Sequence, residues 1–298
     1  MPPRAKAPTP DLVDVLIIGG GPAGLTSAVS IARNVHTAIV FDSNSYRNER
    51  TAHFHMLPTW DGKNPIEFRD IARVNTLEGY ETIFYEDLKI EKANKNDDGL
   101  FEVTDENGKT YPDLTSVGDE ASINDVAPIP IALHVTRNAA RFTKYVTIYT
   151  NGDTSKIDDF KAAIGPTAPF TVDGRRITKF ALGPNQLGIT ITFEDGTTKD
   201  EAFLGHKPLS KLKSDFLAKQ LGLELTPQGD LKVSPPFGET TLSGCFAAGD
   251  NSSFLKTTPN AVNSGANSAA GVASHVQAGM YGQKSLSEAM QAIQKKPA

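Results

Sequence analysis

The sequence predicts an α/β protein with two domains, in which the first domain is interrupted by a smaller one. Three observations support this prediction. Aliphatic residues 14–18 run into a glycine-rich turn and then into an amphipathic helix. Short alternating segments separated by turn residues follow at 82–111. A strand that ends in Gly-Asp, at 244–250, returns the chain to the first domain.

The opening segment has the pattern of a Rossmann-like dinucleotide-binding unit. Residues 14–18 predict a buried parallel strand. Gly19, Gly21 and Gly24 then form a G-x-G-x-x-G motif, whose glycines permit a tight turn, close approach to a pyrophosphate, and close packing of helix on strand. The predicted helix at 25–33 would offer free N–H groups and its positive dipole end to the phosphates.

A second strand and a group of short strands follow. Residues 37–41 predict a strand that ends at Asp42, an acid at the place where a carboxylate binds ribose hydroxyls. Three short alternating segments with turn residues between them predict a β-meander inserted in the domain; they span 82–85, 88–91 and 100–104.

The middle of the chain predicts a boundary and then a second α/β unit. Residues 112–128 are rich in turn formers, so a loop or domain boundary is expected there. The elements expected after it are a helix at 129–142, a strand at 145–149, two strands within 176–199, and an amphipathic helix at 210–221.

Near the C-terminus the sequence returns to ligand-binding chemistry. The strand at 244–250 ends at Asp250, and the carboxyl ends of strands are where open α/β sheets bind ligands. An aspartate in this position also serves as a helix or turn cap. The helix predicted at 260–277 is rich in Gly, Ala and Ser, which suits close approach to a flat ring or simply tight helix packing.

Composition excludes several classes of protein. The net charge of −5 argues against a nucleic-acid partner. A single cysteine, Cys245, permits neither an internal disulfide nor a cysteine-rich metal site. His53 and His55 have no third ligand nearby in the sequence, so no metal site is expected. Residues 1–10 lack the apolar core of a signal peptide and no apolar run is long enough to span a bilayer, so a cytoplasmic protein without membrane contact is expected.

In combination, these motifs resemble a known family. The segments 14–24 and 244–250 are similar to the two FAD signatures of low-molecular-weight thioredoxin reductases, which are class II pyridine nucleotide-disulfide oxidoreductases. Three further segments resemble the fungal branch, which includes dithiol oxidases and reductases of gliotoxin-type pathways; they are 41–48, 53–61 and 256–261. The resemblance covers residues 12–111 and 129–280.

The resemblance implies a cofactor, a domain plan and site residues. It implies a Rossmann-like FAD-binding domain with a β-meander, at 1–112 and 230–298, and a smaller, shortened NAD(P)H-binding-like domain at 113–229. The FAD pyrophosphate would lie on Gly19, Gly21, Pro22, Ala23 and Gly24. The other positions implied are Asp42 at the adenosine ribose, Arg47 and His55 along the FAD, Asp250 at the ribityl chain, and Asn260 and Ala261 at the pyrimidine edge of the flavin.

The sequence departs from the family in two places. The Cys-x-x-Cys that exchanges electrons with the flavin is absent, and Cys245 is expected to be a buried structural thiol. After the meander the chain passes from 112–119 directly to a family-like segment at 129–134, so a few tens of residues are missing. Of the second nucleotide site only 117–119 resembles a glycine-rich turn, which leaves NADPH binding open.

These observations predict an FAD-dependent oxidoreductase that moves two electrons between flavin and a small-molecule substrate or NAD(P)H, without a redox cysteine pair. No catalytic residue is assigned. The alternative is a catalytically impaired flavin-binding protein descended from such an enzyme. An NAD-dependent dehydrogenase that uses only the first fold is disfavoured by the Gly-Asp strand. The family also suggests a homodimer.

Overall fold

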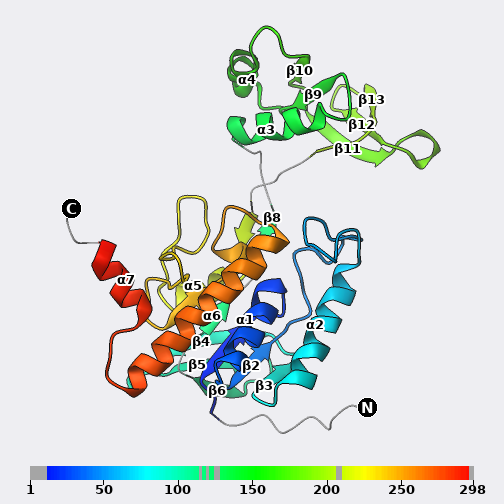
Figure 1. Cartoon of the computed structure of the whole chain (residues 1–298). Helices are drawn as coiled ribbons and strands as arrows, with labels where there is room; N and C mark the ends of the chain where they lie inside the picture. The colour runs from blue at the N-terminus through cyan, green and yellow to red at the C-terminus, as the bar shows by residue number, and fades with distance from the viewer. Residues whose placement is uncertain (1–11, 114–115, 119–120, 124–127, 206–209, 295–298) are drawn as a thin grey trace. The chain divides into compact units, whose positions relative to one another are not determined.

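The computed structural model describes residues 12–113, 116–118, 121–123, 128–205 and 210–294. The chain forms two compact units, unit 1 from residues 1–122 and 211–298, and unit 2 from 123–210 (Figure 1). The sequence placed these divisions at 112/113 and 229/230. The difference arises because the chain stays in unit 1 for two more strands before it leaves, and returns to it before helix α5.

Unit 1 is built on a five-stranded parallel sheet in the order β15-β7-β1-β2-β3. The strands are β1 (Val15–Ile18), β2 (Ala38–Phe41), β3 (Ile83–Glu86), β7 (Ser116–Gly118) and β15 (Cys245–Ala247). In the register of the sheet, the last residues of all five strands lie side by side, Ile18 beside Phe41 and Gly118 for example. The segments that follow the strands therefore meet at one edge.

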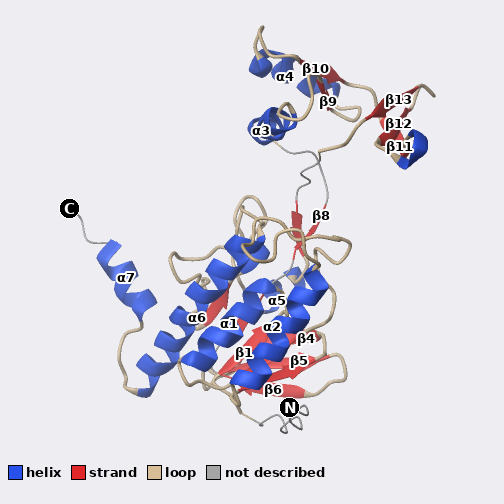
Figure 2. Ribbon diagram, turned by 45° about the vertical axis from the view of Figure 1, so that its right-hand side comes forward, coloured by secondary structure: helices blue, strands red, loops and turns tan. Residues whose placement is uncertain are grey.

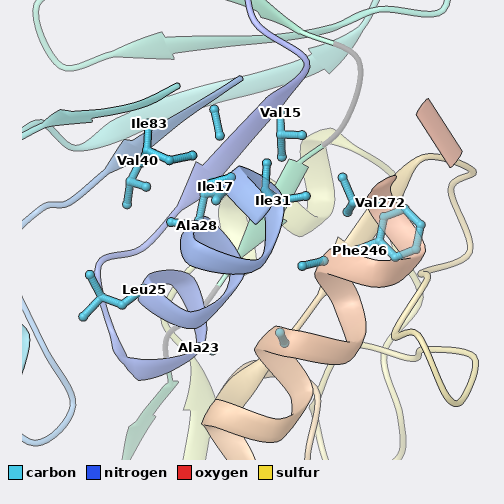
Figure 3. Close-up of a cluster of buried hydrophobic side chains, with 14 of the residues drawn as sticks. Val15, Ile17, Ala23, Leu25, Ala28, Ile31, Val40, Ile83, Phe246 and Val272 are labelled. Atoms are coloured by element: carbon cyan, nitrogen blue, oxygen red, sulfur yellow. The ribbon is translucent and has the colours of Figure 1, made fainter. Parts of the chain in front are cut away.

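One face of this sheet is covered by helices α1 (Pro22–Arg33), α2 (Pro65–Gly79) and α6 (Thr258–Met280) (Figure 2). Figure 3 shows the core beneath them, where Ile17 and Val40 of the sheet meet Ala28 of α1 and Val272 of α6. The small residues of α6 allow a close approach to α1. A Cβ atom on Gly265 would collide with the carbonyl oxygen of Ala23, and Ser27 Oγ donates to the Gly265 carbonyl over 2.9 Å.

The opposite face carries an antiparallel β-meander and a short helix. The meander consists of β4 (Ile90–Lys95), β5 (Phe101–Asp105) and β6 (Thr110–Asp113), and the helix is α5 (Asp215–Gln220). A second buried cluster joins Phe41 of the sheet to Tyr111 and Leu217. The chain of unit 1 ends with η3 (Gly249–Asn251), α6 and α7 (Leu286–Gln294).

Unit 2 has a much smaller parallel sheet. Helix α3 (Ile129–Ala139) leads to β9 (Val146–Tyr149), and η1 (Thr154–Lys156) and α4 (Ile157–Ile164) lead to β10 (Phe170–Asp173), which pairs with β9 in parallel. An antiparallel sheet of β11 (Ile177–Leu182), β12 (Ile189–Phe193) and β13 (Thr198–Glu201) follows, with η2 (Pro184–Gln186) between its first two strands. The hydrophobic core of unit 2 is formed by Leu133 of α3, Ile148 of β9 and Phe160 of α4. Strands β8 (Ala121–Ile123) and β14 (Ser210–Leu212) pair where the chain passes between the units.

The structure corrects several predicted elements. Of residues 82–85, expected in the meander, 83–85 belong to the parallel edge strand β3. The expected loop at 112–128 contains strands β7 and β8, and β7 is an internal strand of the sheet between β15 and β1. Residues 114–115, 119–120 and 124–127 of this range lie outside the described residues. The two strands expected within 176–199 are β11 and β12, and the third strand of their sheet, β13, begins at Thr198; residues 210–221 contain a strand before the helix.

Helix α2 was not predicted, although its start has a clear local signal. Asn64 caps the helix by accepting the Ile66 N–H over 2.8 Å, and Pro65 occupies the first helical position. Several large apolar side chains of α2 remain exposed, which weakens the one-sided pattern by which amphipathic helices are recognised.

Candidate functional site

The glycine motif lies at the carboxyl edge of the parallel sheet, between β1 and α1. Gly19 has φ of 116°, a left-handed conformation that side chains rarely adopt. Gly21 is the N-cap of α1 and makes no side-chain capping hydrogen bond. A Cβ atom on Gly24 would collide with the Gly19 carbonyl oxygen, so only glycine lets the helix begin this close to the strand. The first turn of α1 therefore presents uncapped N–H groups at the edge of the sheet.

Asp42 follows β2 and is buried next to the same turn. Its carboxylate accepts the Tyr46 hydroxyl over 2.6 Å and the Asn44 N–H over 2.9 Å. A Cβ atom on Gly20 would collide with this carboxylate. The packing thus places an acid directly beside the glycine turn, where the ribose of a dinucleotide is expected.

A small groove is lined by residues from both the N-terminal and the C-terminal segments of unit 1. It has a volume of about 50 Å³ and its lining comes from α1, the loop after β2 and the start of α6: Gly21, Pro22, Tyr46, Arg47, Asn48, Asp250, Thr257, Thr258 and Ala261. Two helices begin here, so two positive dipole ends point to one place. The groove is suited to a pyrophosphate with a larger group on either side.

Asp250 and Arg47 form an ion pair at this groove. Arg47 Nε contacts the Asp250 carboxylate, which is largely buried. Burial raises the pKa of Asp250, although Arg47 opposes this shift. Lys256 Nζ supports the same loop by donating to the Asp250 carbonyl and to the Asp230 carboxylate, over 2.6 Å each. These contacts hold the Gly-Asp turn after β15 in a defined position.

The start of α6 is organised by side chains that act as caps. Thr257 accepts the Asn260 N–H over 3.4 Å. The Asn260 amide donates to Ser253 Oγ over 2.9 Å and to the Leu255 carbonyl over 3.0 Å, so it holds the preceding loop. Ala261 is buried and lines the groove. The structure brings this helix start together with Gly21 and Pro22, some 240 residues earlier in the chain.

The structure does not bring His55 into this group. The His55 side chain is 69% exposed, and its Nδ1 lies 3.5 Å from the Asp61 carboxylate. It lines none of the cavities described here. Its place along the cofactor stays a prediction.

Cys245 is buried in β15, as expected of a structural thiol. It borders a second cavity of about 310 Å³ between the sheet, the meander and α5, whose lining is largely apolar. Within the described part of the chain, no cluster of three potential metal-ligating side chains occurs. The described helices include none that is long and apolar enough to cross a membrane.

The residues present fit a dinucleotide with a pyrophosphate. A Cβ atom on Gly20 or Gly24 would collide with the Asp42 carboxylate or the Gly19 carbonyl, so the turn keeps the tight form that suits a pyrophosphate. Among the described residues, the buried Asn251 side chain has no hydrogen-bond partner, and it lines the second cavity rather than the groove. Tyr46, Asn48 and Lys256 lie within the segments that resemble the family, but the sequence by itself assigns them no role. Their roles depend on contacts with distant residues, which a local pattern does not contain.

Comparison with known proteins identifies the cofactor and the family. The FAD binding domain family matches residues 14–54. The chain is 37% identical to thioredoxin reductase tcpT of Claviceps purpurea over 317 aligned positions, which cover 93% of this chain and 98% of that protein. It is 36% identical to thioredoxin reductase aclD of Aspergillus oryzae, with 89% and 96% covered. The first alignment is longer than the 298 residues of this chain, so that relative has residues which this chain lacks.

Solved structures show the same fold. An oxidoreductase from Agrobacterium tumefaciens superposes with a TM-score of 0.76 at 24% identity and covers 90% of this chain and 99% of its own. Thioredoxin reductase from Streptococcus pyogenes gives a TM-score of 0.67 at 16% identity, with 91% and 100% covered. The predicted α/β fold with a Rossmann-like FAD-binding domain is confirmed. The chain belongs to the thioredoxin-reductase-like family of FAD-dependent oxidoreductases, in its fungal branch.

Proposed function

We propose that this enzyme transfers two electrons directly between FAD and a small organic molecule of fungal secondary metabolism, with no cysteine relay between them. One observation carries the proposal: a glycine turn and groove suited to FAD occur in a chain with a single cysteine, and that cysteine is buried in β15. Thiol–disulfide relay needs an accessible thiolate and a second sulfur. Cys245 meets neither requirement within this chain.

The residues of the groove would hold and orient the cofactor. When bound, FAD supplies the isoalloxazine ring that accepts and returns the two electrons. The first turn of α1 would donate N–H groups to the pyrophosphate, and Asp42 would accept from the ribose. The N-terminus of α6 would stabilise negative charge that develops at the pyrimidine edge. The loop held by Lys256 and Asn260 would keep Asp250 at the ribityl chain.

Reductive titration of the purified protein tests this proposal. The protein should show a flavin absorption spectrum, and anaerobic mixing with NADPH, NADH or a small dithiol should bleach it. Thioredoxin should not be turned over. Robust NADPH-dependent reduction of thioredoxin would show that a disulfide relay exists and would refute direct transfer.

A second candidate function is flavin binding without turnover. The observation that favours it lies in unit 2, where the parallel sheet of the described residues has two strands only and α3 follows no strand of that sheet. A nucleotide-binding domain of this type binds its ligand between neighbouring strand ends. A flavin that is bound normally but reduced by none of the three reductants would support this candidate.

NADPH as electron donor, a cytoplasmic location and a homodimer stay predictions. The net charge of −5 and the single cysteine support an intracellular protein without a nucleic-acid partner. Sedimentation of the flavin-loaded protein at several concentrations would test the dimer.

A further inference from the structure

Arg69 of α2 is a charged side chain buried beside the FAD groove, and the proposed function gives it no role. The residue is 6% exposed. Its guanidinium lies 3.7 Å from the centre of the Tyr46 ring, and its Nη1 donates to Asn48 Oδ1 over 3.3 Å. Both contacts are with the loop that follows β2, and Tyr46 and Asn48 line the groove.

These contacts do not neutralise the charge of the guanidinium. A cation over an aromatic ring recovers only part of the free energy that removing an ion from water costs. Among the described residues, no carboxylate forms an ion pair with Arg69. The Asp42 carboxylate is reached only through Tyr46, whose hydroxyl donates to it over 2.6 Å. In the part of the chain that the structure describes, Arg69 is therefore a buried cation without a direct counter-ion.

Arg69 contacts the loop that borders the groove. The loop from 43 to 48 is held at three points: Tyr46 on Asp42, the Tyr46 ring on Arg69, and Asn48 on Arg69. The same loop carries Arg47, which pairs with Asp250 across the groove. A pyrophosphate in the groove would bring two negative charges next to Tyr46 and Asn48, the two residues that Arg69 contacts.

We propose that Arg69 is a positioning residue of the FAD site, which holds the 43–48 loop against the groove and whose charge is compensated by the cofactor's pyrophosphate. Arg69 acts through Tyr46 and Asn48. The inference rests on FAD binding in this groove and is independent of the electron acceptor. It predicts that affinity for FAD and stability of the FAD-free protein respond differently when the charge is removed.

Three variants of the full chain test this proposal. In Arg69→Met the apolar stem remains but the charge is lost. The dissociation constant for FAD, measured by quenching of flavin fluorescence, should rise at least about tenfold, or about 1.4 kcal/mol. The melting temperature of the FAD-free protein should stay equal or rise, because a buried unpaired charge has been removed. Arg69→Lys keeps the charge but loses the planar stacking on the Tyr46 ring, so its affinity for FAD should fall clearly less than that of Arg69→Met.

Arg73, one turn further along α2, provides the matched control. Its guanidinium pairs with the Asp87 carboxylate over 2.5 Å and it does not line the groove. Arg73→Met should leave the dissociation constant for FAD within about threefold.

Three results would overturn the inference: an unchanged affinity in Arg69→Met, a loss in Arg69→Lys equal to that in Arg69→Met, or a melting temperature of FAD-free Arg69→Met that falls together with its affinity. Failure of the original protein to take up FAD would instead refute FAD binding in this groove.

Discussion

The two units of this molecule are both built from strands and helices in alternation, yet their sheets differ. In unit 1 five parallel strands end side by side, and both faces of the sheet are buried. In unit 2 the only parallel pair of the described residues is β9 with β10. A dinucleotide site depends on neighbouring strand ends, because the glycine turn, the acid and the second helix each follow a different strand.

The edge of β9 shows what unit 2 lacks. The Thr150 N–H donates to the Asp173 carbonyl. In a strand every second residue directs its backbone groups to the same side, so the backbone N–H groups of Ile148 and Val146 also face β10. Thr147 and Tyr149 therefore direct their backbone groups away from β10, beside a cavity of about 360 Å³. Tyr145 and Phe142 nearby are more than 80% exposed. Among the described residues no strand pairs with this edge of β9, and an unpaired edge beside a cavity predicts that unit 2 is the less stable of the two.

The largest expected effect breaks the site of unit 1. Gly24→Val places a side chain against the Gly19 carbonyl, so the dissociation constant for FAD should rise about 100-fold, as an overpacking cost of about 3 kcal/mol implies. Gly79→Val is the control, since a Cβ atom there meets nothing within 4 Å. Equal affinity in both variants would mean that the cradle does not bind the cofactor.

A second prediction separates the units by their response to FAD. Calorimetry should show two unfolding transitions, and FAD at 100 times its dissociation constant should raise the free energy of unfolding of unit 1 by about 2.7 kcal/mol. The transition of unit 2 should not move. A single transition that shifts as a whole would show that the two units unfold together.

Proline substitutions sharpen the contrast at β9. Ile148→Pro removes a donor that faces β10 and should destabilise unit 2 by about 1–3 kcal/mol. Thr147→Pro removes a donor that faces the open edge and should cost clearly less. The effect of each substitution is measured from the unfolding transition of unit 2, which is expected at the lower temperature. Equal losses of stability in the two variants would contradict an unpaired edge.

The smallest effect is a pH response of opposite sign in the two units. The hydrogen bond from Arg175 lowers the pKa of Asp173 in unit 2, so its contribution to stability is present above the unfolded pKa of about 3.9 and is lost as pH falls through the folded value. Burial raises the pKa of Asp250 in unit 1, so its contribution is full below that unfolded value and is lost as pH rises through the folded one.

Melting of the FAD-free protein at pH values from about 6 to about 3 tests this difference. In Asp173→Asn, the melting temperature of unit 2 should fall less steeply as the pH is lowered. In Asp250→Asn, the melting temperature of unit 1 should show less of the opposite dependence on pH. A change of the same sign in both units would contradict the assignment.

Local patterns sufficed for the parts of this protein that are encoded in short stretches of chain. The glycine turn needs only residues 19–24, and the buried strands are continuous aliphatic runs, so both were predicted correctly. The acid after β2 and the Gly-Asp turn after β15 were found for the same reason. Their chemistry depends on residue type and on a position at the end of a strand.

Pairing between distant segments required the folded chain. A run of alternating residues does not specify its neighbour, so residues 82–85 were assigned to the meander and β7 to a loop. Arg47 contacts Asp250, and Arg69 contacts Tyr46. Nothing in the local sequence around these residues indicates which partner each one has. Hydrogen bonds, charge interactions and burial depend on which residues are neighbours in space. For these residues, the sheet and the helices that cover it determine those neighbours.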